Sequence, residues 1–164
     1  ENTSTPTALI LSRQNIADLP SMHGDDYSAR FADALQAQRG GYIVCRDDNP
    51  QVTLVGNGSE VATLVEAAKL IKEKQELRVQ IVSVPSIGLF LNQDEDYRNS
   101  VIPADIPAFG LTAGLPSTLQ RVVSHGTIQG LDHFGESAPY KILDEKFGFT
   151  PQNVAENILK MCCK

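Results

Sequence analysis

The sequence predicts an α/β fold: a three-layer sandwich in which a mixed, mostly parallel sheet of about five strands has helices on both faces. Short apolar runs, typical of buried strands, alternate with longer segments whose apolar residues recur at helical spacing. This alternation requires crossover connections, which make neighbouring strands parallel. The 164 residues, 41% of them hydrophobic, are enough to bury a core without disulfides. One domain is therefore expected.

The amino-terminal part begins with a linker-like stretch. Residues 1–6 are rich in Ser, Thr, Asn and Pro and carry no Met start, so we expect residues 7–164 to be a single domain cut from a longer polypeptide. The continuous apolar run Thr7–Ser12 predicts a strand covered on both faces. After a polar loop, Asp25 or Asp26 can cap a helix that ends at the glycine pair 40–41. The apolar face of this helix consists of Tyr27, Phe31, Ala34 and Leu35.

Two short strands and a long helix come next. Tyr42–Arg46 and Val52–Val55 are separated by the turn-forming residues 47–51, which predicts a hairpin and hence one antiparallel pair. Ser59 is a natural N-cap for the following helix, and Glu60 suits its positive first turn. The inward face of this helix is expected to comprise Val61, Leu64, Val65, Ala68 and Ile71.

The remaining elements continue the alternation. Strands are predicted at Arg78–Val84, Ile106–Leu111 and Thr127–Leu131. Helices are predicted around Gln93–Ser100, within Leu115–Val123, from a Ser137 cap with Pro139 in the first turn to Gly148, and after Thr150-Pro151 with Val154, Ile158 and Met161 inward. In such sheets ligands bind at the carboxyl ends of the strands.

Composition excludes several classes of function. A net charge of −6 argues against a nucleic-acid binder, because no basic stripe offsets the acidic balance. No run approaches the roughly 20 apolar residues of a membrane span. The three cysteines, Cys45 and the adjacent Cys162 and Cys163, are no disulfide framework, which favours a reducing cytoplasm. We interpret the adjacent pair as the last turn of the terminal helix rather than a metal or redox site.

Three features are candidates for chemistry. Arg13 follows the first apolar run, where it is either a solvated strand end or a residue that binds phosphate or carboxylate. The second role is chemically suitable because the guanidinium group is always charged and presents several hydrogen-bond donors in one plane. Gly56 and Gly58 stand between a strand and a helix, as the first two glycines of a dinucleotide-binding motif would. Val61 stands where that motif has its third glycine, so a tight turn is favoured over a nucleotide site. His133, close to Asp132 and Glu136, allows an acid–base pair or a structured loop that caps a helix.

Several segments, taken together and in order, resemble the carboxy-terminal domain of transketolase. The resemblance covers nearly the whole chain. Its motifs are LSRQN at 11–15, GGY at 40–42, GSEV at 58–61, VSVPS at 82–86, FLNQDEDYRNSVIP at 90–103, FGESAP at 134–139 and FGFT at 147–150. The sequence departs from the family at Thr112, where many members have Glu, and in residues 18–30.

The resemblance implies the last domain of a homodimeric enzyme of the pentose phosphate pathway. Transketolases transfer a two-carbon ketol unit from a ketose phosphate to an aldose phosphate. Their thiamine diphosphate, their Mg²⁺ or Ca²⁺ and their catalytic histidines are held by the two preceding domains. This chain alone is therefore expected to be inactive, with no catalytic, cofactor or metal residue of its own. The arginine of LSRQN binds the terminal phosphate of the substrate, a role that the resemblance assigns to Arg13.

Two alternatives stay open. The same domain occurs in other thiamine-dependent enzymes, namely deoxyxylulose phosphate synthase, dihydroxyacetone synthase and the 2-oxo acid dehydrogenase components. A free-standing module that binds anions or regulates an enzyme is the other. Sugar preference, the oligomeric state of the isolated domain, and whether one gene encodes the thiamine-binding domains are not determined by the sequence, nor are roles for His133, Cys162 and Cys163.

Overall fold

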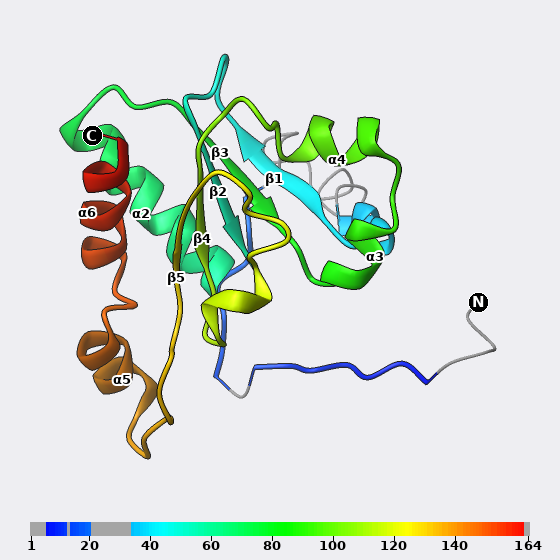
Figure 1. The fold of residues 1–164 in the computed structure, drawn as a ribbon. Helices are drawn as coiled ribbons and strands as arrows, with labels where there is room; N and C mark the ends of the chain where they lie inside the picture. Colours follow the sequence, from blue (N-terminus) through cyan, green and yellow to red (C-terminus); the bar gives the residue numbers. More distant parts are fainter. Residues whose placement is uncertain (1–5, 13, 21–33, 163–164) are drawn as a thin grey trace.

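A computed structural model describes residues 6–12, 14–20 and 34–162. They form one mixed sheet with helices on both faces, as the sequence predicts (Figure 1). The strand order is β1-β3-β2-β4-β5. The strands are β1 (Tyr42–Arg46), β2 (Val52–Gly56), β3 (Val79–Ser83), β4 (Ala108–Leu111) and β5 (Gly126–Gln129). Only β1 is antiparallel to its neighbour, and all other pairs are parallel.

The predicted hairpin is wrong, because β3 lies between β1 and β2. All five residues of β3 are buried, whereas β1 is only partly buried, so burial favours β3 as the interior strand and β1 as the edge. The turn after β1 reaches across the start of β3: Asp47 N–H donates to Val79 O at 3.0 Å, and Gln51 N–H donates to Arg78 O at 2.8 Å. The turn residues therefore connect two strands that both pair with a third.

One face of the sheet is covered by the long helices α2 (Glu60–Lys74) and α6 (Pro151–Cys162). Four of the five predicted inward residues of α2 are buried, and Leu64 and Ile71 are fully so, whereas Val65 is partly buried and the unpredicted Ala67 is buried as well. Ser59 precedes α2 as expected, but its side chain makes no capping bond to the helix backbone. The terminal helix begins at Pro151 as predicted and buries Val154, Ala155 and Ile158. None of the described helices combines the length and the apolar character needed to cross a bilayer.

The other face is covered by α3 (Ile87–Leu91), α4 (Glu95–Val101) and the turns after β4. Within 115–123, where a longer helix is expected, the structure has only the short 3₁₀ helix η2 (Pro116–Thr118). The turn that follows η2 places Leu119, Val122 and Val123 in the core. The helix α5 (Tyr140–Phe147) follows β5 and begins after Pro139 rather than Ser137. Gly148 ends α5 with φ +77°, as expected of a C-cap glycine.

The amino-terminal segment differs most from expectation. Residues 6–12 form no strand, and Leu9, Ile10 and Leu11 are 84%, 94% and 82% exposed. A strand covered on both faces is therefore wrong for this chain, since no described segment pairs with the run, which extends away from the sheet in Figure 1. Most of the helix predicted after Asp25 or Asp26 lies outside the described residues. The part described at its end comprises the helical residues Ala34 and Leu35 and the 3₁₀ helix η1 (Gln36–Arg39), which stops at Gly40. Ala34 and Leu35, predicted on the apolar face, are both exposed.

Candidate functional site

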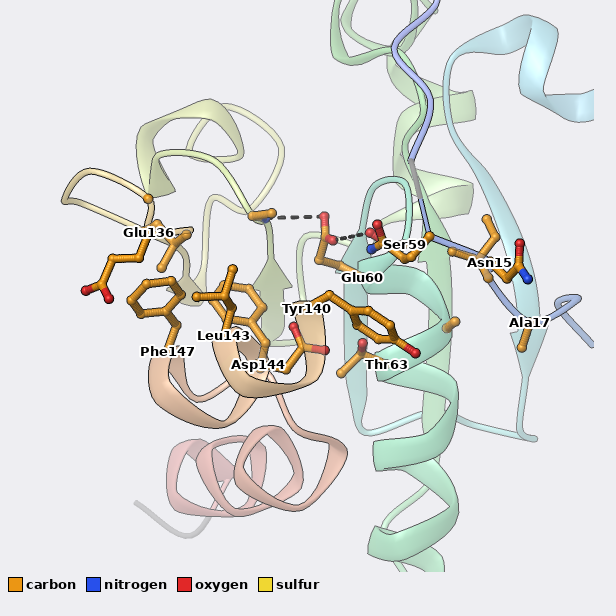
Figure 2. Close-up of a pocket in the computed structure, with 17 residues that line it drawn as sticks. Asn15, Ala17, Ser59, Glu60, Thr63, Glu136, Tyr140, Leu143, Asp144 and Phe147 are labelled. Carbon is orange, nitrogen blue, oxygen red and sulfur yellow. Dashed lines mark hydrogen bonds between the residues drawn. The ribbon is translucent and has the colours of Figure 1, made fainter. Parts of the chain in front are cut away.

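Arg13, the one residue to which the family resemblance assigns a role at the site, lies outside the described residues. The residues that follow it, 14–17, line a pocket of about 350 Å³. The other walls come from the first turns of α2, the helix α5 and the loops that follow β4 and β5 (Figure 2). The pocket therefore lies at the carboxyl ends of the parallel strands, where α/β sheets place ligands.

Glu60 is the main polar residue that the first turn of α2 contributes. The turn before it is tight: Gly58 has φ +61°, and a Cβ on Gly56 would come within 2.9 Å of Leu64 Cδ1. This packing explains the two glycines without a nucleotide. The Glu60 carboxylate accepts a hydrogen bond from the Ser59 hydroxyl at 2.7 Å and one from Ala113 N–H at 3.2 Å. Burial nevertheless raises the pKa of Glu60, and the nearby charge of Asp144 raises it further.

Asp144 projects from α5 on the opposite wall. In Figure 2 it lies with Tyr140 on the side of the pocket that faces Glu60 and Thr63 of α2. Burial raises the pKa of Asp144 as well. Within the described part of the chain, no side chain donates a hydrogen bond to this carboxylate. The pocket thus presents the partly desolvated carboxyl groups of Glu60 and Asp144 between apolar walls.

The FGESAP segment and His133 form a loop at the same end of the molecule. Glu136 accepts hydrogen bonds from Lys146 Nζ with both oxygens at 2.6 Å, which pins the loop to α5. The His133 ring packs against Phe147, with ring centroids 4.9 Å apart, and its Nδ1 lies 2.9 Å from Phe134 O. The Glu136 carboxylate therefore pairs with Lys146 rather than with His133, so the structure does not support an acid–base pair of His133 and Glu136. Phe134 itself is 97% exposed.

The FLNQDEDYR motif, residues 90–98, makes structural contacts on the face of the sheet opposite α2 and α6. The Tyr97 hydroxyl donates to Gly41 O at 2.8 Å, and its ring stacks under the Arg39 guanidinium. Arg39 Nε also donates to Gln93 Oε1 at 3.3 Å. Thr112, where the resemblance expects Glu, is only 3% exposed, and its hydroxyl oxygen accepts from Gly114 N–H. Through the contacts of Tyr97 and Gln93 with Arg39 and Gly41, the FLNQDEDYR motif ties η1 to the helices α3 and α4.

Sequence reasoning missed Asp144 altogether and gave Glu60 only a helix-start role. Asp144 stands four residues after Tyr140, so both lie on one face of α5, and this spacing was the available signal. For Glu60, the glycine-rich turn after a buried strand marks the carboxyl end of the sheet. The described residues bring together no group of three or more His, Cys, Asp or Glu side chains that could hold a metal ion.

The fold and the strand-end pocket define the class as an α/β domain with one antiparallel edge strand. Comparison with known proteins gives the family: residues 40–150 match the model of the transketolase-like TK C-terminal domain. Transketolase 2 of Vibrio parahaemolyticus is 40% identical over 157 residues, which are 94% of this chain and 22% of that protein. The chain therefore belongs to the transketolase family, as a carboxy-terminal domain.

Solved structures agree. Transketolase from Leishmania mexicana matches with a TM-score of 0.72 and 33% identity, over 78% of this chain and 18% of that one. A Pichia stipitis transketolase in complex with sedoheptulose 7-phosphate matches with a TM-score of 0.73 and 29% identity, over 79% of this chain and 19% of that one. The chain spans about a fifth of the length of the curated relatives it matches.

Proposed function

We propose that this chain is the carboxy-terminal domain of a transketolase that transfers a two-carbon ketol unit from a ketose phosphate to an aldose phosphate. The observation that carries the proposal is the family match over 40–150 together with the near-complete coverage of the chain by a 40% identical transketolase. The Pichia stipitis relative, described with a bound sugar phosphate, supports the substrate class.

We propose that Arg13 binds the terminal phosphate of the substrate. Two observations support this role: Arg13 is the arginine of the LSRQN motif, and the residues that follow it line the strand-end pocket. The carboxyl groups of Glu60 and Asp144 make that pocket itself unfavourable for a dianion. The phosphate would therefore need the Arg13 cation together with groups from the rest of the enzyme. Such a charge-assisted contact contributes about 1.5–3 kcal/mol.

The rest of the enzyme is also part of the proposal. Thiamine diphosphate and Mg²⁺ or Ca²⁺ would be bound by preceding domains, in a homodimer and in the cytoplasm, and this chain would position substrate and support the architecture. The exposure of Leu9, Ile10 and Leu11 supports a neighbouring domain, because three consecutive apolar side chains in water are unfavourable. A strand of that domain could pair with this run and bury it.

The full-length protein, supplied with thiamine diphosphate and Mg²⁺, tests the function. We expect interconversion of pentose phosphates. Consumption of pyruvate instead would identify a related thiamine enzyme, and no turnover of either would contradict the proposal. The 164-residue chain should be inactive and should bind no sugar phosphate in isothermal titration, because one arginine cannot offset the cost of association. Measurable binding would favour the free-standing anion-binding module.

A further inference from the structure

Three carboxyl groups line the pocket, and two of them, Glu60 and Asp144, lack a positively charged partner in the part of the chain that the structure describes. Glu60 receives its hydrogen bonds from neutral donors, a hydroxyl and a backbone N–H. Asp144 receives none from any described side chain. Of the two lysines on the same helix, Lys141 is exposed and makes no ion pair with Asp144, and Lys146 directs both of its hydrogen bonds to Glu136. Two carboxylates in a partly desolvated pocket destabilise each other, and a cation bound beside them would relieve this repulsion.

The walls of the pocket suit the body of a basic side chain. Tyr140, Leu143 and Phe147 of α5 line it together with Leu131. Arginine and lysine carry a long apolar stem and a charged end, and their charge is also attracted to aromatic faces. A guanidinium or ammonium group would meet the two carboxylates while its stem packs on these walls. Phosphate and other anions are disfavoured by the same charges.

The location of the pocket indicates where the basic side chain comes from. Residues 14–17 line it, and the segment before them carries the exposed Leu9, Ile10 and Leu11. Phe134, nearly fully exposed, belongs to the loop whose Gly135 and Glu136 also line the pocket. The relatives are several times longer than this chain, so most of their surface lies outside it. An acidic pocket beside exposed apolar side chains complements a protein surface that is apolar and basic.

We propose that the pocket between α2 and α5 receives an arginine or lysine side chain from the part of the full-length protein outside these 164 residues. The proposal rests on the proposed function in one respect, namely that the chain is a domain of a longer protein. The contact locks α5 and the FGESAP loop against the neighbouring domain. It is an interface contact and takes no part in ketol transfer.

Hydrogen exchange of the α5 amides, measured in the full-length protein and in the 164-residue chain, tests the proposal. In the full-length protein, Asp144→Asn should accelerate exchange of these amides roughly tenfold, because the variant leaves the cation of the neighbouring domain without its partner. In the 164-residue chain the same change should leave exchange unaltered or slow it, because an unpaired carboxylate is removed.

Glu73→Gln is the matched control, since Glu73 is an exposed glutamate on the same helix as Glu60. It should alter exchange in neither protein. Faster exchange in both proteins on Asp144→Asn would overturn the proposal, because the cation would then belong to this chain. An unchanged full-length protein would overturn it too. So would a 164-residue chain that sediments as a dimer until Asp144 is replaced, since the occupant would then be a second copy.

The same full-length samples separate this proposal from the proposed function. Ketol transfer without any exchange response would keep the function and remove the contact. An exchange response without ketol transfer would keep the contact and remove the function.

Discussion

The guanidinium carbon of Arg39 lies 3.2 Å from the centroid of the Tyr97 ring. The same tyrosine donates its hydroxyl to Gly41 O and meets Phe90 edge-on, with ring centroids 6.3 Å apart. Tyr97 on α4 thus holds the residues that lead into β1, although 58 positions separate it from Arg39 in the sequence. This contact gives a physical reason for the Tyr in the FLNQDEDYR motif.

Tyr97→Phe should lower the free energy of unfolding by about 0.5–1.5 kcal/mol, because the hydrogen bond to Gly41 is lost while the ring stays under Arg39. Tyr97→Leu should lower it by roughly twice as much, since the cation–π contact is lost too. Urea titration measures both changes. Tyr140→Phe, on the exposed Tyr140, is the control and should stay within about 0.5 kcal/mol of the wild type. Equal effects at both tyrosines would contradict the role of Tyr97.

Gly40 and Gly58 both have positive φ, +89° and +61°, but only Gly40 is crowded. A Cβ on Gly40 would lie 2.5 Å from Ser86 O and still closer to Phe90 N, whereas one on Gly58 meets nothing within 4 Å. Gly58→Ala should therefore cost about 1–2 kcal/mol for the left-handed backbone alone. Gly40→Ala should cost about 3 kcal/mol or more, because overpacking is added. Thermal unfolding ranks the two, and a Gly58 variant as unstable as the Gly40 variant would refute the explanation.

Asp47 predicts how the chain responds to acid. Partial burial raises its pKa, but hydrogen bonds from Lys72 and from Val79 N–H outweigh burial and hold the pKa below its usual value. The unfolded chain therefore binds the proton more readily, so this contribution is present above the unfolded pKa and is lost as pH falls through the folded one. Solvent screening limits it to about 1 kcal/mol.

Asp47→Asn should remove that contribution at pH 7 and flatten the loss of stability below about pH 4. Urea titrations repeated between neutral and acidic pH measure both effects. Asp48→Asn, at the exposed neighbour, should leave the profile unchanged. A profile for the Asp47 variant that parallels the wild type would show that this carboxylate has no part in acid unfolding.

The spacing of apolar residues predicted the layers of the fold, because buried strands and amphipathic helices each have a characteristic local pattern. The apolar face of α2 and the start of α6 at Pro151 are examples. Pairing could not be predicted in the same way: the hairpin between β1 and β2 is contradicted because β3, remote in sequence, competes for the same edges. Local turn signals say nothing about a third strand.

The same distinction holds for the site. Residues 7–12 have the composition of a buried strand, yet Ile10 is 94% exposed, because no described segment of the chain packs over it. The sequence predicted that ligands bind at the carboxyl ends of the strands, and the family resemblance assigned phosphate binding to Arg13. The carboxyl pair of Glu60 and Asp144 depends on how α5 packs beside α2, which no motif encodes. The division into residues 1–6 and 7–164 stays a prediction.

The phosphate role of Arg13 is the central claim, and the KM of the full-length Arg13→Ala variant tests it most directly. We expect KM for phosphorylated ketoses to rise by roughly one to two decades with a smaller change in kcat, because the phosphate is remote from the bond that breaks. Arg13→Lys should recover part of the loss, and Arg46→Ala, at an exposed arginine on β1, should leave KM unchanged. An unchanged KM for phosphorylated ketoses in the Arg13→Ala enzyme would contradict the account.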